Sequence, residues 1–83
     1  MLADQWTADG GSRILPWTMT IQVNGQPEQA DAGETIRTLL EKRRLSPDKV
    51  AIELNRRLLK SDRYDQPLNE GDQIEIVTFV GGG

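Results

Sequence analysis

The sequence predicts a single α+β domain in which one main helix packs across one face of a mixed sheet of four to five strands, in the order ββαββ. Three observations predict it. Apolar and polar residues alternate over 19–23, 50–55 and 73–80, which is the period of half-buried strands. A single stretch, 35–45, has the apolar spacing of a helix instead. The chain has 83 residues, which suits one small domain.

The first two strands are expected to form a hairpin. The alternation from Met19 to Val23 ends at Asn24-Gly25. Both of these residues tolerate positive φ, so we expect a two-residue turn of type I′. The returning strand, 26–32, is polar and contains Pro27, which has no amide hydrogen for a central ladder. We therefore expect an edge strand.

The main helix is expected over 35–45. Thr35 would cap it, and Glu34 would place a favourable negative charge near its start. The pair Arg43-Arg44 is expected in the last turn, where its charge complements the helix C-terminus. Ser46-Pro47 then prevents the helix from continuing. The apolar face comprises Ile36, Leu39, Leu40 and Leu45.

A second hairpin follows the helix. The alternation over 50–54 is expected to turn at Asn55-Arg56 into a short strand through 58–59. A helical turn anchored by Tyr64 and Leu68 comes next.

The last strand, 73–80, follows a turn over 69–72 in which Gly71 takes the left-handed position. The first and last strands are the natural central neighbours of such a sheet. Ile74 and Ile76 would then face the helix. Their expected core partners are Ile21, Val23, Ile36, Leu39, Leu40, Ile52 and Leu54.

The opposite face of the last strand offers a candidate contact surface. Val77 and Phe79 would lie there beside Glu75, and Val80 follows them. A solvent-facing side should be polar, so apolar residues at this position indicate partner binding. The alternative is that Trp17, or another part of the N-terminal segment, covers them.

The chain then runs into Gly81-Gly82-Gly83, a flexible tail expected over 81–83. Glycine has no Cβ, so such a tail fits a channel too narrow for other residues. Three extended residues reach about 10 Å. The Gly83 carboxylate is therefore the candidate reactive group, carried into another protein's active site. Taken alone, the three glycines fit a frayed end or a linker better.

Composition excludes several kinds of chemistry. The chain has no cysteine and no histidine, so disulfides, thiol nucleophiles, histidine bases and the usual zinc and iron–sulfur ligands are missing. We expect no catalytic residue, no metal site and no bound cofactor. The net charge of −3 argues against nucleic acid and anionic membranes, and favours a basic patch on a protein partner. No apolar run approaches the ~20 residues of a membrane span, and a cysteine-free chain fits a reducing, cytoplasmic location.

The N-terminal segment differs from the rest of the chain because glycine and proline interrupt any periodicity. We expect a mostly disordered extension over 1–18 and a folded domain over 19–80. One hypothesis is that Met19 is the natural start of the protein. The alternative is that Trp17 or Leu15 packs onto the domain as an added edge.

Four segments, taken together and in order, carry a family resemblance: Ile21 to Gly25, Val50 to Asn55, Leu68 to Val77 and Phe79 to Gly83. They resemble the ubiquitin-like β-grasp sulfur carriers, and most closely the ThiS family of thiamine biosynthesis. The resemblance covers Met19 through Gly83. Residues 1–18 have no counterpart in the pattern.

The resemblance implies a sulfur carrier that is a co-substrate of enzymes and not itself an enzyme. An E1-like adenylating enzyme of the ThiF type would use ATP and magnesium to adenylate the Gly83 carboxylate. Sulfur from cysteine, delivered through a cysteine desulfurase or another donor, would displace AMP and leave a terminal thiocarboxylate. A thiazole synthase of the ThiG type would take this sulfur into the thiazole ring of thiamine, together with a deoxyxylulose phosphate and a glycine-derived imine.

Three other functions are compatible with such a fold. Small subunits of molybdopterin synthase share the fold and the Gly-Gly terminus, but supply sulfur to a dithiolene; the triple glycine after Phe79-Val80 and the Val23-Asn24-Gly25 turn favour the thiamine carrier. A ubiquitin-like modifier would join the same carboxylate to a lysine. An interaction or RNA-binding module would have no terminal chemistry, and the acidic balance argues against RNA.

Overall fold

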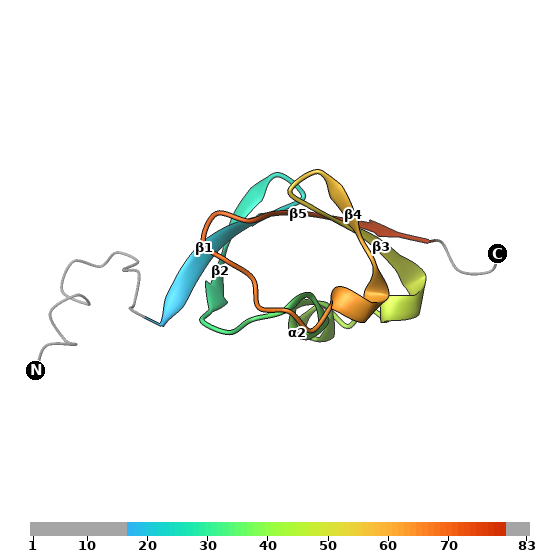
Figure 1. Ribbon diagram of the computed structural model, residues 1–83, viewed down its shortest axis with the longest axis horizontal. Helices are drawn as coiled ribbons and strands as arrows, with labels where there is room; N and C mark the ends of the chain where they lie inside the picture. Colours follow the sequence, from blue (N-terminus) through green and yellow to red (C-terminus); the bar gives the residue numbers. More distant parts are fainter. Residues whose placement is uncertain (1–16, 80–83) are drawn as a thin grey trace, which may run out of the picture.

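A computed structural model of the chain describes residues 17–79. Five strands and one main helix follow each other in the predicted order of a hairpin, the helix, a second hairpin and a last strand (Figure 1). The predictions for 1–16 and 80–83, which include Leu15, Val80 and the glycine tail, lie outside the described residues. The elements are β1 (Thr18–Val23), β2 (Gln26–Asp31), α2 (Ile36–Lys42), η1 (Pro47–Lys49), β3 (Val50–Leu54), β4 (Arg57–Leu59), η2 (Ser61–Arg63) and β5 (Gln73–Thr78).

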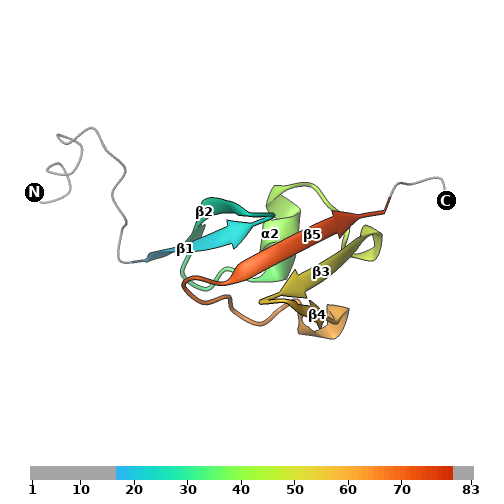
Figure 2. The same cartoon turned by 90° about the horizontal axis from the view of Figure 1, so that it is seen from above.

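The strands form one mixed sheet in the spatial order β2-β1-β5-β3-β4. β5 is the central strand, parallel to β1 on one side and antiparallel to β3 on the other. α2 lies across one face of this sheet (Figures 1 and 2). The α+β prediction is confirmed, with five strands, and so is the prediction that the first and last strands are neighbours.

The first hairpin turns where its sequence predicts. Asn24 and Gly25 have φ of 52° and 82°, so both occupy the left-handed region that a type I′ turn requires. β2 is an edge strand, which is where Pro27 is tolerated. β1 begins at Thr18, one residue before the expected domain boundary, and the preceding carbonyl of Trp17 accepts a hydrogen bond from the amide of Ala32.

The start of α2 is capped as expected. The Thr35 hydroxyl accepts from the Thr38 amide at 3.1 Å, and the Thr38 hydroxyl accepts from the Thr35 amide at 2.9 Å. This is a capping box in which a threonine replaces the usual glutamate or glutamine.

The end of α2 differs from the prediction. The helix ends at Lys42, so Arg43 is its C-cap and Arg44 lies beyond it with φ of 58°. The amides of Arg44 and Leu45 donate to the carbonyls of Glu41 and Leu40, which is a Schellman motif with arginine at the position that glycine usually occupies. The expectation that both arginines lie in the last turn was wrong.

Glu34 lies directly before the N-cap of α2, near the helix start as expected. Its side chain is only 3% exposed and accepts a hydrogen bond from Lys42 Nζ at 3.0 Å, a contact that the sequence did not indicate. The second carboxylate oxygen, Oε2, has no hydrogen-bond partner. This hydrogen bond raises the pKa of Lys42.

The second half of the chain follows the predicted course. Asn55 and Arg56 form a turn with φ of 52° and 71°, and β4 pairs with β3 after it. Tyr64 and Leu68, in the segment between η2 and β5, are buried, as expected. Gly71 has a φ of 83°, in the left-handed region predicted for this turn.

The core lies between α2 and the sheet. Its fully buried side chains come from α2 and from three strands, β1, β3 and β5, at positions that the apolar spacing predicted: Ile21, Ile36, Leu39, Leu40, Ile52 and Ile74. Leu54, Leu59 and Ile76 pack against this core while remaining partly exposed. Within residues 17–79, no helix is long and apolar enough to cross a membrane.

Candidate functional site

The candidate site is the outer face of β5, the face turned away from α2. β5 is hydrogen-bonded to a neighbour on each side, and Val77 lies directly opposite Ala51 of β3. The strand ends at Thr78 and not at Val80 as expected. One more backbone bond follows, because the amide of Phe79 donates to the carbonyl of Lys49 at 2.8 Å. The backbone of Phe79 is therefore fixed to the sheet.

Val77 and Phe79 are exposed, as the sequence predicts. Each retains 54% of its accessible surface, although both are large apolar residues. Trp17 does not cover them: it is itself 58% exposed and precedes β1. Because β1 and β5 are parallel with Gln22 opposite Gln73, Trp17 and Val77 lie roughly 25 to 30 Å apart along the strands at about 3.3 Å per residue.

Asn24 is hydrogen-bonded to the backbone of β5, a role that its turn motif did not indicate. Its side-chain oxygen accepts from the amide of Ile76 at 2.8 Å, and its own amide donates to the carbonyl of Ile74 at 2.8 Å. The first turn therefore continues the β1–β5 pairing beyond the end of β1. Ile76 immediately precedes Val77, so this contact positions the exposed face.

A second polar cluster holds the beginning of β5. The buried Asp72 accepts from Asn55 Nδ2 at 3.0 Å and from the amide of Asn69 at 2.8 Å. The side-chain oxygen of Asn55 accepts from the amide of Gln73 at 2.9 Å. Two turns that are distant in sequence are thus joined to one strand end. Sequence spacing alone does not indicate this, because the partners are 17 and 18 residues apart.

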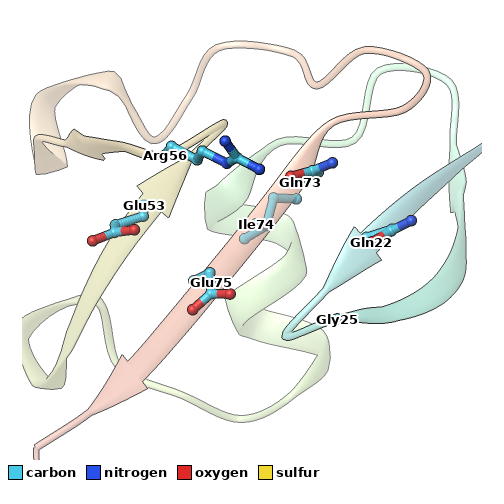
Figure 3. A pocket seen from close by; sticks show the side chains of 7 residues that line it. All are labelled: Gln22, Gly25, Glu53, Arg56, Gln73, Ile74 and Glu75. Atoms are coloured by element: carbon cyan, nitrogen blue, oxygen red, sulfur yellow. The ribbon is translucent and has the colours of Figure 1, made fainter.

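The outer face is polar towards the other end of β5. A hollow of about 310 Å³ is lined there by residues from three strands and two turns. Glu53 on β3 and Glu75 on β5 occupy directly opposite positions of the paired strands. Figure 3 shows that the Glu53 carboxylate points away from β5, while Arg56 points towards Gln73. Directly opposed like charges cost stability. The lining residues are Gln22, Gly25, Glu53, Arg56, Gln73, Ile74 and Glu75.

The described residues thus bring together two of the predicted contact residues, Val77 and Phe79, on one rigid face. Val80, Gly81, Gly82 and Gly83 lie outside the described part of the chain. No group of three potential metal ligands occurs within residues 17–79. A five-stranded mixed sheet holding one helix, with an exposed apolar surface at the end of its central strand, defines a small protein of the ubiquitin-like β-grasp class.

Comparison with known proteins specifies the family. The pattern of the ThiS family matches residues 21–83. The chain is 39% identical over 66 residues to the sulfur carrier protein ThiS of Bacillus subtilis, covering 76% of this chain and 98% of that protein. It is 44% identical over 66 residues to a thiazole synthase of Magnetococcus marinus, covering 78% of this chain but only 20% of that protein.

A solved structure agrees with these sequence matches. The crystal structure of a thiamine biosynthesis protein (ThiS) from Geobacter metallireducens superposes with a TM-score of 0.62 and 32% identity, covering 78% of this chain and all of that one. The chain belongs to the ThiS family of β-grasp sulfur carrier proteins.

Proposed function

We propose that this chain carries sulfur for the thiazole moiety of thiamine, and that the Gly83 carboxylate is the carrying group. The observation that supports this most is the exposed surface of Val77 and Phe79, at the end of a central strand, in a chain whose ThiS-family match continues through residue 83. The tail would extend from this fixed strand end into an enzyme, while the two exposed residues contact the surface around the channel.

The proposed chemistry needs no side chain of the carrier. A carboxylate is a poor electrophile, so an adenylating enzyme first joins it to AMP from ATP, with magnesium, and releases pyrophosphate. A thiol reductant releases hydrosulfide from the persulfide that the desulfurase forms with cysteine sulfur, and the hydrosulfide attacks the carbonyl carbon and displaces AMP. The product is a thiocarboxylate whose sulfur is a far better nucleophile than a carboxylate oxygen. A chain without cysteine suits this role, because sulfur is held by the terminus.

The proposed acceptor of this sulfur is a thiazole synthase. In the Magnetococcus marinus relative, a segment similar to this chain is part of a protein named thiazole synthase. We place the adenylating enzyme, the sulfur donor and this synthase in the cytoplasm with the carrier.

Intact mass spectrometry tests the proposal. The chain is incubated with the adenylating enzyme, ATP, magnesium, a cysteine desulfurase, cysteine and a thiol reductant. We expect a mass increase that matches the replacement of one oxygen by sulfur, located at Gly83 by fragmentation. A variant lacking Gly83, or carrying one added alanine, should gain no sulfur and should unfold at the same temperature as the unmodified chain.

Other results would direct the proposal elsewhere. Sulfur loaded on Gly83 but accepted only by molybdopterin synthase would replace thiazole by a dithiolene as the destination. A lysine-linked conjugate would identify a modifier. No mass change with enzymes shown to be active on a control carrier would contradict the sulfur-carrier chemistry itself.

A further inference from the structure

A second surface lies at the opposite edge of the sheet from the first hairpin. β4 is the last strand on that side, and η2 follows it directly (Figure 2). Between them is a hollow of about 380 Å³. Three apolar and three basic residues line it: Leu54, Arg57, Leu58, Leu59, Lys60 and Arg63.

The charge of this hollow is opposite to that of the protein. The chain has a net charge of −3, yet the hollow has three cations and no acidic residue in its lining. Within residues 17–79, three of the other cations form ion pairs, namely Arg37, Lys42 and Arg43, whereas Arg44, Lys49 and Arg56 do not. Arg57, Lys60 and Arg63 form none in that part of the chain. Their charges are therefore available to an acidic partner.

The hollow also has the features of a peptide site. Leu58 is 70% exposed, more than any other large apolar residue of the described chain. Leu54 and Arg57 flank a two-residue turn, so they form a hydrogen-bonded pair of the antiparallel ladder. The next pair, Glu53 and Leu58, is therefore a non-hydrogen-bonded pair. The amide and carbonyl of Leu58 consequently point to the open side of the sheet. An extended segment could pair with them and cover the leucine.

We propose that this hollow, defined by Arg57, Leu58, Lys60 and Arg63, binds an acidic, partly apolar, extended segment of the thiazole synthase. The inference rests on the proposed function for the identity of the partner. The apolar half of the lining, with Leu58 70% exposed, favours a partly apolar protein segment over nucleic acid or a free phosphate as the occupant.

The position of the hollow fits one partner that also holds the tail. Leu59 lies opposite Ile52 of β3, which lies opposite Ile76 of β5. Lys60 is therefore level with Val77, about 10 Å away across two strand spacings. A single synthase surface can contact both, and the two contacts together fix the direction in which the tail enters.

Binding of the full chain to thiazole synthase tests this inference. We expect the triple variant Arg57→Glu/Lys60→Glu/Arg63→Glu to bind at least about tenfold more weakly at low salt, and the difference to shrink as salt screens the charges. Leu58→Ser should weaken binding without any change of charge. Lys60→Glu is compared with Arg44→Glu, which makes the same charge change at an exposed site away from the hollow, and only the former should reduce affinity.

Several results would overturn the inference. Unchanged affinity of the triple variant, with its thermal unfolding shown to be intact, would do so. Equal losses for Lys60→Glu and Arg44→Glu would reduce the effect to net charge. A loss confined to the adenylating enzyme would assign the hollow to a different partner.

The two proposals fail in different ways. If the unmodified chain binds no thiazole synthase, the proposed function has failed. The hollow is then tested alone by titrating the ¹⁵N-labelled chain with the peptide acetyl-Glu-Leu-Asp-Phe-Glu-amide. Shifts confined to residues 57–63 would support an acidic-peptide site there, and their absence would refute it.

Discussion

Phe79 allows the proposed docking role of the outer face of β5 to be measured directly. Its ring is 54% exposed in the free protein, and its backbone is fixed by the hydrogen bond to Lys49. A phenylalanine buries about 200 Å² when fully enclosed, so roughly 100 Å² remain to be buried by a partner. At about 25 cal/mol per Å², this contact contributes about 2.5 kcal/mol, which corresponds to roughly 50-fold in affinity.

We therefore expect Phe79→Ala to raise the dissociation constant for the adenylating enzyme by roughly 50-fold, as measured by isothermal titration calorimetry. The fold should be retained, because the ring is not part of the core. Trp17→Ala is the matched control. It removes an aromatic ring of similar exposure, 58%, near the far end of the sheet.

The comparison of the two variants decides whether the outer face of β5 binds the adenylating enzyme. If both weaken binding equally, or if Phe79→Ala binds as tightly as the unmodified chain, the outer face of β5 does not dock the enzyme. A loss of thermal stability in Phe79→Ala that is as large as the loss of binding free energy would show that the ring supports the fold instead.

Three further predictions concern stability. Lys42→Met leaves the buried carboxylate of Glu34 without its cation and should lower the free energy of unfolding by about 1 to 2 kcal/mol, less than for a fully buried pair because Lys42 is half exposed. In urea unfolding, the double variant Lys42→Met/Glu34→Gln should recover part of this loss, and no recovery would argue against the pairing. Asn24→Gly keeps the turn but removes the acceptor for the Ile76 amide, so we expect a loss of about 1 kcal/mol, whereas Asn24→Asp, which retains an oxygen, should lose less. The pKa of Lys42 is raised by its hydrogen bond to Glu34, and the pKa of Tyr64 is raised by burial. The folded state therefore holds both protons more tightly than the unfolded state, so this stabilisation is complete below about pH 10 and is lost as the pH rises further. Equal unfolding free energies at pH 8 and pH 11 would contradict this prediction.

The fold was predictable because its strands and turns are determined locally. The alternation before Asn24-Gly25 and the left-handed glycine at position 71 each specify one backbone conformation. The end of α2 was not predictable in the same way. Arg44 adopts a left-handed conformation that its residue type disfavours. This conformation lets the Leu45 amide donate to the carbonyl of Leu40 while the Leu45 side chain packs against the core.

The candidate site was likewise predictable only in part. Exposure of Val77 and Phe79 follows from the period of one strand and was correctly predicted. The contact of Asn24 with Ile76 joins residues that are 52 positions apart, so it depends on the order of the strands, which local spacing does not encode. The cations around Leu58 are close in sequence, but that they line one hollow with Leu58 depends on the direction of their side chains.

The central position of β5 has a consequence for how the domain opens. β1 and β2 form one hairpin and β3 and β4 another, and within the described chain β5 is the strand that pairs with both. Local fraying at either edge leaves β5 protected, whereas its own release separates the two hairpins and exposes the core. Amides of β5 should therefore exchange with deuterium only through global unfolding, among the slowest in the molecule. A carrier that hands its end to successive enzymes would keep its attachment point rigid until the entire domain unfolds.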